Sequence, residues 1–208
     1  MSTVARTTRS RNYGPECHGR RMSYEEFASA AWQEGYQYEL IHGRIEVAAM
    51  PNMPHFSLDG WLKRRLQEYA DHHSQVINLV GGPVRVLVPD VADATCPEPD
   101  VGAYQDFPLH LPFDDLDWRD YSPILVVEII SPDNARKDLE RNVDLYLLVP
   151  AIREYWIIDP RESADRPSMI VHRRRGKNWQ KPIHVAYKET YTTKLLPGFA
   201  LVMDPHQR

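Results

Sequence analysis

The residue of this sequence that points most directly to chemistry is a carboxylate inside an apolar run. Residues Ile124–Ile130 are apolar except for Glu128. A continuous apolar run rich in β-branched residues predicts a strand that is buried on both faces. A carboxylate in such a strand loses hydration worth several kcal/mol unless another group compensates. Glu128 alone leaves open the simpler interpretation, a structural glutamate held by an arginine or by backbone donors.

A second acid makes a functional site the better interpretation. Asp100 opens another short predicted strand, which runs to Ala103. Two acids at the ends or centres of neighbouring core strands form a pocket of hard oxygen ligands, and such ligands suit Mg²⁺ or Mn²⁺. Asp100 and Glu128 therefore predict a divalent cation site.

Two further polar residues are candidates for the same site. Glu39 lies in a predicted strand between Tyr38 and Leu40. Alternation places its side chain on the face opposite both neighbours, so it points either to water or toward the acidic pocket. His55 lies in a predicted loop before a helix and could contact a ligand, although a solvent-exposed loop histidine is the simpler alternative.

Local patterns predict the elements that must position these residues. Ser23 and Glu26 form a capping box, which marks the start of a helix, and Gly35 marks its end. Apolar periodicity and turn residues predict the other elements. They are helices at 57–70 and 133–149, hairpins at 36–41 with 44–49 and at 76–80 with 83–88, a buried strand at 154–158, and a strand pair at 169–174 with 183–187.

Composition restricts the class of protein. The chain has 208 residues, of which 42% are hydrophobic, and this suffices for one globular domain. The polar segment Met1–Arg21 is predicted to be a flexible basic arm, with a single domain over residues 22–208. The formal net charge of −4 gives no global electrostatic case for binding nucleic acid. Because the sequence shows no signal peptide or membrane span, the cytoplasm is the expected location.

Two charged segments each allow two interpretations. Residues 104–121 form a long predicted loop in which five aspartates alternate with aromatic residues. These acids would repel phosphate and hinder duplex DNA, or the loop is a solvated lid packed by its aromatics. The turn Arg173–Lys177 is either a solvated hairpin tip or a contact for nucleic acid.

Several motifs in register resemble one protein family. They are Tyr38–Arg44, His55, Pro99–Val101, Val126–Pro132 and Glu154–Pro160. In this order they resemble the Uma-two family of bacterial proteins, which are described as restriction endonucleases of the PD-(D/E)xK nuclease superfamily. The resemblance covers nearly the whole chain, from about Ser23 to Pro205.

The resemblance implies an α/β (α+β) fold of the restriction-endonuclease type, with a central mixed sheet flanked by helices and additional antiparallel hairpins. It also implies that Asp100, Glu128 and the carbonyl of Ile129 hold Mg²⁺ or Mn²⁺. Glu39 matches the early acid that completes such sites, and His55 and Tyr146 are the expected substrate contacts. The implied partner is nucleic acid, in the first place DNA, and a homodimer is compatible with the resemblance.

The sequence departs from the family pattern at the lysine that orients or deprotonates the attacking water. The position two residues after Glu128 is Ile130, and the family's lysine, four residues before Tyr146, is Asn142 here. An amide can orient a water but cannot act as a base at neutral pH. Arg141 is one residue earlier and is expected to point about 100° away around the helix.

The leading hypothesis is therefore a Mg²⁺-dependent endonuclease that hydrolyses phosphodiester bonds in nucleic acid and is weakened by Asn142. The alternative is a catalytically degenerate member of the same fold that binds metal or nucleic acid, for example as an oligomer. The acids Glu39, Asp100 and Glu128 favour the first hypothesis, and Asn142 with the acidic loop favours the second. An unrelated metal-dependent hydrolase is a third alternative.

Overall fold

The computed structural model describes residues 12–131 and 135–207. The chain forms two compact units, and the predicted single domain over residues 22–208 stays a prediction. The first unit comprises Met1–Met50 with Val91–Cys96, and the second comprises Pro51–Asp90 with Pro97–Arg208. Among the described residues, no helix combines the length and the apolar character needed to cross a membrane.

The first unit contains one helix and two small sheets. Its elements are β1 (Asn12–Tyr13), α1 (Tyr24–Ser29), β2 (Ala31–Trp32), β3 (Tyr36–Ile41) and β4 (Arg44–Ala49). β1 pairs with β2 in parallel, and β3 pairs with β4 antiparallel. Residues 12–21 of the predicted arm thus include a strand and a short 3₁₀ helix, Pro15–Cys17. Residues 1–11 lie outside the described residues.

The β3–β4 hairpin and the start of α1 confirm the sequence prediction. Positive φ angles at His42 and Gly43 form the tight turn between the strands. The Ser23 hydroxyl accepts from the Glu26 N–H, and the Glu26 carboxylate accepts from the Ser23 N–H. The predicted end of α1 at Gly35 is wrong, because the next residues form β2, where Trp32 stacks on Tyr38.

The second unit is built on a mixed sheet in the order β10-β9-β8-β7-β6-β5, with β11 also paired to β9. β7 and β8 are parallel, and the other neighbours are antiparallel. The strands are β5 (Leu79–Gly81), β6 (Val101–Tyr104), β7 (Leu125–Ile129), β8 (Glu154–Asp159), β9 (Ser168–Arg175), β10 (Asn178–Trp179) and β11 (Ile183–Val185). A separate antiparallel pair consists of β12 (Thr190–Thr192) and β13 (Ala200–Val202). This arrangement confirms the predicted fold class.

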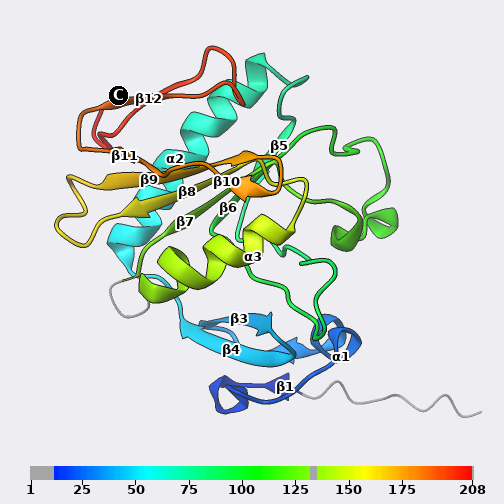
Figure 1. Ribbon diagram of the computed structural model, residues 1–208. Helices are drawn as coiled ribbons and strands as arrows, with labels where there is room; N and C mark the ends of the chain where they lie inside the picture. The colour runs from blue at the N-terminus through cyan, green and yellow to red at the C-terminus, as the bar shows by residue number, and fades with distance from the viewer. Residues whose placement is uncertain (1–11, 132–134, 208) are drawn as a thin grey trace, which may run out of the picture. The chain divides into compact units, whose positions relative to one another are not determined.

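Helices cover the two faces of this sheet (Figure 1). α2 (Met53–His72) packs on one face. On the other lie a π-helical turn, Lys137–Arg141, and α3 (Asn142–Leu148). Successive side chains along the central strands point to opposite sides, so each strand contributes side chains to both faces of the sheet. The helix predicted at 133–149 begins at Asp133, which lies outside the described residues.

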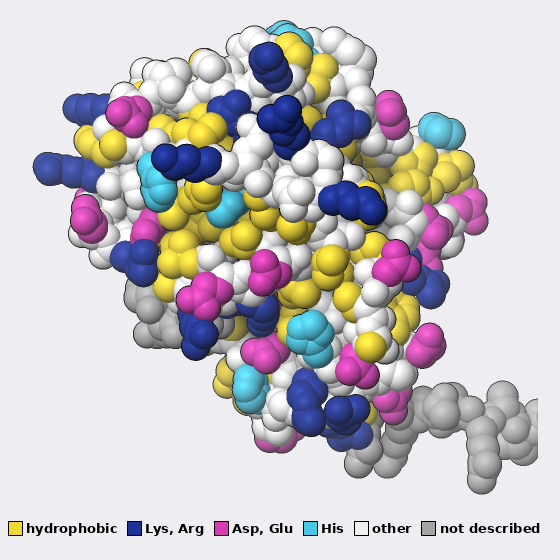
Figure 2. All heavy atoms as spheres, in the orientation of Figure 1, with side chains coloured by type: hydrophobic (Ala, Val, Ile, Leu, Met, Phe, Trp, Pro, Cys, Tyr) yellow, Lys and Arg dark blue, Asp and Glu magenta, His cyan; other side chains and the backbone are white. Residues whose placement is uncertain are grey.

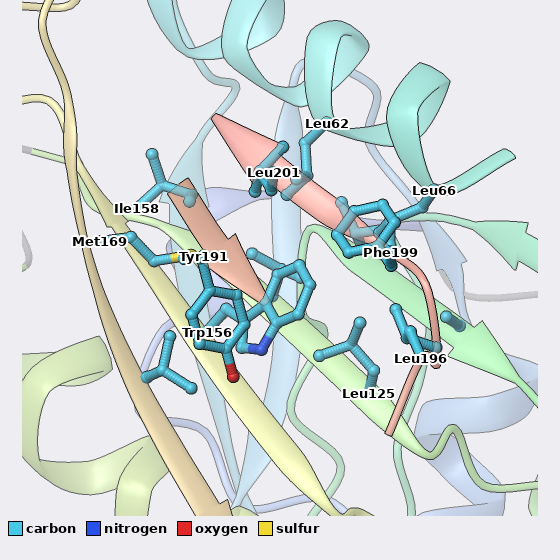
Figure 3. Close-up of a cluster of buried hydrophobic side chains, with 14 of the residues drawn as sticks. Leu62, Leu66, Leu125, Trp156, Ile158, Met169, Tyr191, Leu196, Phe199 and Leu201 are labelled. Atoms are coloured by element: carbon cyan, nitrogen blue, oxygen red, sulfur yellow. The ribbon is translucent and has the colours of Figure 1, made fainter. Parts of the chain in front are cut away.

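The hydrophobic core of the second unit lies on the α2 face. Figure 3 shows Trp156 of β8 beside Tyr191 and Phe199, with Leu62 and Leu66 of α2 above them. The indole of Trp156 meets the Tyr191 ring edge-on, with their centroids 5.4 Å apart. This packed layer makes β7 and β8 a rigid support for the side chains on the opposite face.

One predicted hairpin differs from the structure. The hairpin of residues 76–80 with 83–88 is wrong, since β5 pairs with β6, while Val84 and Val86 donate to the carbonyls of Pro99 and Pro97. This pairing is non-local, so local turn signals do not reveal it. In the acidic loop, Phe113 is 90% exposed, whereas Phe107 packs against Tyr104 and Tyr121 with ring centroids 5.5 and 5.1 Å apart.

Candidate active site

Asp100 and Glu128 face each other at one end of the central sheet. The antiparallel register of β6 and β7 pairs Val101 with Val127, so its extension by one residue puts Asp100 opposite Glu128 on the same face. The backbone N–H of Ile129 donates to Asp100 Oδ2 at 2.8 Å. Both acids are buried, with exposed fractions of 8% for Asp100 and 2% for Glu128. The two strands thus bring together two nearly dehydrated carboxylates.

Residues from α3 hold the Glu128 carboxylate. Asn142 Nδ2 and the Tyr146 hydroxyl donate to Glu128 Oε1 at 2.7 and 2.8 Å. The two residues are four apart, so they lie one above the other on a single face of the helix. Both are completely buried. The helix therefore presents two neutral donors to a charged group.

Asn142 also connects Glu128 to a third acid that the sequence hypothesis did not include. Its Nδ2 lies 3.3 Å from Oδ1 of Asp138, whose exposed fraction is 4%. Its Oδ1 accepts a hydrogen bond from Arg141 Nε at 3.1 Å. The expectation that Arg141 points away is therefore wrong, because its long side chain reaches the neighbouring amide. The four-residue spacing of Asp138 and Asn142 was the signal for the third acid.

The helix is widened where Asp138 lies. Residues Lys137–Arg141 are π-helical, and the N–H of Asn142 bonds to the Lys137 carbonyl, five residues back. In this turn the carbonyl of Asp138 accepts from the Tyr155 hydroxyl of β8 at 2.9 Å. Such π-helical insertions are rare and often occur at functional sites.

Tyr155 remains a neutral phenol in this environment. Burial raises its pKa well above 10, and the negative charges of Glu128, Asp138 and Asp100 add to the shift, whereas Arg141 opposes it. The Tyr155 hydroxyl can therefore donate a hydrogen bond but carries no charge at neutral pH.

His55 contacts Asp100 from α2. Its Nε2 lies 3.2 Å from Asp100 Oδ2, and its side chain is 11% exposed. Burial by itself lowers the pKa of His55, but the hydrogen bond and charge of Asp100, together with Asp59, raise it overall. The predicted loop position is wrong, because α2 already begins at Met53 and the Asn52 side chain caps the N–H of His55. The cap residue followed by Pro54 was the overlooked helix start.

Arg174, one arginine of the predicted basic turn, forms hydrogen bonds with the end of α3. The Arg174 guanidinium of β9 donates to the carbonyls of Tyr146, Leu147 and Val149, each at 2.9 Å. A cation here satisfies the free carbonyls at the end of the helix and opposes the negative end of its dipole. Arg174 thus holds the helix that carries both donors to Glu128.

A family model matches residues 24–204, and its family, Uma2, is described as "Putative restriction endonuclease". The chain belongs to the Uma2 family. It is also similar in fold to a solved protein from Anabaena variabilis ATCC 29413, titled "a putative nuclease belonging to DUF820". That similarity has a TM-score of 0.68 at 17% identity and covers 88% of this chain and 95% of the other. Among curated proteins, a search finds no match.

Membership of the Uma2 family gives the early acid, Glu39, a predicted role that the structure does not test. Glu39 is buried on β3 of the first unit, opposite Glu46 of β4. The acids Asp100 and Glu128 belong to the second unit. Participation of Glu39 in the site therefore stays a prediction.

Neither the sequence patterns nor the Uma2 resemblance pointed to Asp59. It follows His55 by four residues on α2, and its Oδ2 accepts from Lys63 Nζ at 2.8 Å. Its other oxygen, Oδ1, is buried and has no hydrogen-bond partner among the residues that the structure describes. Burial raises the pKa of Asp59, Lys63 opposes this shift, and the Asp100 charge adds to it. The equal spacing of His55, Asp59 and Lys63 was the available signal.

Proposed function

We propose that this Uma2 protein is an endonuclease that uses a divalent cation to hydrolyse phosphodiester bonds in nucleic acid. The observation that carries the proposal is the opposed pair of buried carboxylates, Asp100 and Glu128, each fixed by donors from the surrounding fold. Family membership supports the nuclease function.

The donor set fits Mg²⁺ or Mn²⁺. Mg²⁺ is bound through one or two carboxylates and keeps several waters, whereas zinc takes three or four nitrogen, sulfur or carboxylate ligands. Among residues 12–131 and 135–207, no group of three or more His, Cys, Asp and Glu side chains could hold a metal. Asp100, Glu128 and the carbonyl of Ile129 would hold the cation. When bound, it would neutralise charge in the transition state and lower the pKa of the attacking water.

The chain's own residues orient these ligands. The Ile129 N–H and His55 both contact Asp100 Oδ2, and Asn142 and Tyr146 both donate to Glu128 Oε1. Such preorganisation matters because misplacement of a ligand by a fraction of an ångström weakens a site. His55, which is partly exposed, is also the proposed substrate contact. Tyr146 is buried, so a role in substrate binding would require it to act through Glu128.

Asn142 is expected to make this enzyme slow. Its amide donates to Glu128 and Asp138, but it cannot accept a proton from water at neutral pH. A group that orients or deprotonates the nucleophile typically contributes about 10²–10⁴-fold to the rate. The same residue supports the alternative function, a degenerate Uma2 protein that binds metal or nucleic acid without hydrolysis.

DNA is the first proposed substrate, and a homodimer and a cytoplasmic location also remain proposals. Figure 2 shows Lys and Arg side chains interspersed with Asp and Glu over the face in view, without one dominant charge among the residues described. Long-range attraction of nucleic acid by such a surface is weak, so local contacts must supply the affinity.

Cleavage assays on mixed DNA and RNA substrates test the proposal. We expect Mg²⁺ or Mn²⁺ to support cleavage that EDTA abolishes, with Glu128→Gln inactive. Glu140→Gln is the matched control, because Glu140 lies on the same helical segment but is exposed and paired with Arg136. Metal-independent cleavage, or full activity of Glu128→Gln, would refute the proposal. Metal binding without cleavage would favour the degenerate alternative.

A further inference from the structure

Asp59 is a half-buried acid that the proposed reaction does not yet use. Among the described residues, three buried side-chain atoms have no hydrogen-bond partner, namely Asp59 Oδ1, Trp61 Nε1 and Arg173 Nε. Only the first is an acceptor. An unpaired buried acceptor costs free energy, so such an atom in a native fold requires a ligand or a water to explain it.

Residues one helical turn before and after Asp59 on α2 connect it to Asp100 and its neighbours. His55, one helical turn before Asp59, reaches Asp100 Oδ2. Lys63, one turn after it, donates both to Asp59 Oδ2 and to the carbonyl of Gly82. Gly82 in turn lies against the Asp100 backbone, since a Cβ added at Gly82 would come within 1.9 Å of the Asp100 carbonyl oxygen. Three contacts thus tie this part of α2 to one cation ligand.

Among the described residues, Lys63 occupies one oxygen of Asp59 and leaves the other as a buried acceptor without a hydrogen-bond partner. A cation that keeps several waters needs acceptors of this kind around it.

We infer that Asp59 binds the cation through water, with Oδ1 accepting a hydrogen bond from a water of the cation's hydration shell. Lys63 holds the other oxygen and so turns Oδ1 toward that water. This inference rests on the proposed cation site.

Calorimetric titration with Mn²⁺ tests the inference without depending on activity. Loss of a residue that supports metal ligands typically costs about 10–100-fold in metal affinity. We expect Asp59→Ala to weaken Mn²⁺ binding by about this factor. Asp71→Asn is the control and should bind as the wild type does, since Asp71 lies on α2 but is exposed and accepts from Gln67.

Asp59→Asn keeps the test available if Asp59→Ala does not fold. Its amide oxygen can still accept from Lys63, and its NH₂ group then replaces the free acceptor with a donor. Weakened Mn²⁺ binding by either folded variant supports the inference. Equal affinity of wild type and both folded variants would overturn it, and Oδ1 would then bind an ordinary structural water. A wild type that binds no Mn²⁺ would overturn it as well.

The same titration separates this inference from the proposed function. If wild type binds Mn²⁺ more tightly than the Asp59 variants but cleaves neither DNA nor RNA, the inference stands and the hydrolytic function fails. If wild type cleaves with metal and the Asp59 variants bind Mn²⁺ equally well, the function stands and the inference fails.

Discussion

Two buried glutamates on neighbouring strands of the same sheet have different environments. Glu154 of β8 accepts from the Trp156 indole and the Tyr191 hydroxyl at Oε2, at 2.8 and 3.0 Å, and from the Thr193 hydroxyl at Oε1. Arg173 lies 4.0 Å from the latter oxygen. Donors and a cation therefore surround this carboxylate on both sides.

Glu128 of β7 is equally buried, and both other acids and the Arg141 side chain lie nearby. Asn142 and Tyr146 donate to Oε1, Asn142 also bridges to Asp138, and Asp100 is opposite on β6. Clustered buried carboxylates repel one another unless a cation or a proton joins them. Burial alone therefore does not mark a functional acid, whereas the clustering of several acids around it does.

The largest expected difference between the two glutamates is catalytic. Glu128→Gln should reduce metal-dependent cleavage by about 10³-fold or more, equivalent to about 4 kcal/mol of barrier, because it removes a proposed cation ligand. Glu154→Gln should retain cleavage and lose about 1–3 kcal/mol of stability, since its donors lose an anionic partner. Single-turnover kinetics and urea unfolding measure the two effects. Similar losses of activity in both folded variants would remove the distinction.

The second prediction changes the environment of Glu128 by replacing Asn142 with lysine. Asn142→Lys should raise the cleavage rate and recover part of the about 10²–10⁴-fold that a water-orienting base contributes. It also places a cation beside Glu128 and Asp138, so Mn²⁺ affinity should fall. Rate measurements at saturating Mn²⁺ separate the effects. An inactive wild type and an equally inactive Asn142→Lys, both with metal bound, would favour the binding-protein alternative.

Added metal should stabilise the fold through the Glu128 site alone. At a hundredfold excess over Kd the expected gain is about 2.7 kcal/mol. In a chain of this size that gain raises Tm by about 5–10 °C. Thermal unfolding with Mg²⁺ or Mn²⁺ measures the shift, which Glu154→Gln should retain and Glu128→Gln should lose. A Tm that millimolar metal does not change would count against a formed site.

Arg174 should affect the two glutamates unequally. Arg174→Gln removes donors to three carbonyls at the end of α3, and we expect a stability loss of about 2 kcal/mol. Because α3 holds Glu128 but not Glu154, metal affinity should fall as well. Arg175→Gln, at the exposed end of the same strand, is the control. Unchanged Mn²⁺ affinity in a destabilised Arg174→Gln would limit Arg174 to a structural role.

The smallest expected effect is a pH dependence at His172, which stacks on Tyr155. Burial lowers the pKa of His172 below 6.5, and the nearby His184 adds to this lowering. The neutral ring therefore stabilises the fold above the unfolded-state pKa of 6.5, and this contribution is lost as pH falls toward the lowered pKa. Urea unfolding between pH 7 and 5 should show the loss in wild type but not in His172→Phe. The same pH dependence in both proteins would assign it to other groups.

Local signals in the sequence were sufficient for much of the fold. The capping box at Ser23 and the turn at His42–Gly43 place one helix start and one hairpin, and the apolar run around Glu128 gives β7. Pairing of β5 with β6 was not predictable in this way, because it joins segments far apart in the sequence and no local residue encodes the partner.

The candidate site likewise contains residues that the sequence identified and residues that only the fold reveals. Burial of a charge inside an apolar strand singled out Glu128, and family resemblance brought in Asn142 and Tyr146, which the structure places against it. Asp59 and Asp138 were missed, because their importance depends on which residues lie near them across the fold. Spacing of four residues along a helix showed that contact was possible, but not which of the many such pairs is buried.

Mn²⁺ binding measured by calorimetry tests most directly whether Asp100 and Glu128 hold a cation together. We expect one Mn²⁺ bound per chain in wild type and in Glu154→Gln. We expect no binding at this site in Glu128→Ala, where Asp100 has lost the acid opposite it. Equal binding by wild type and folded Glu128→Ala would contradict a shared cation site.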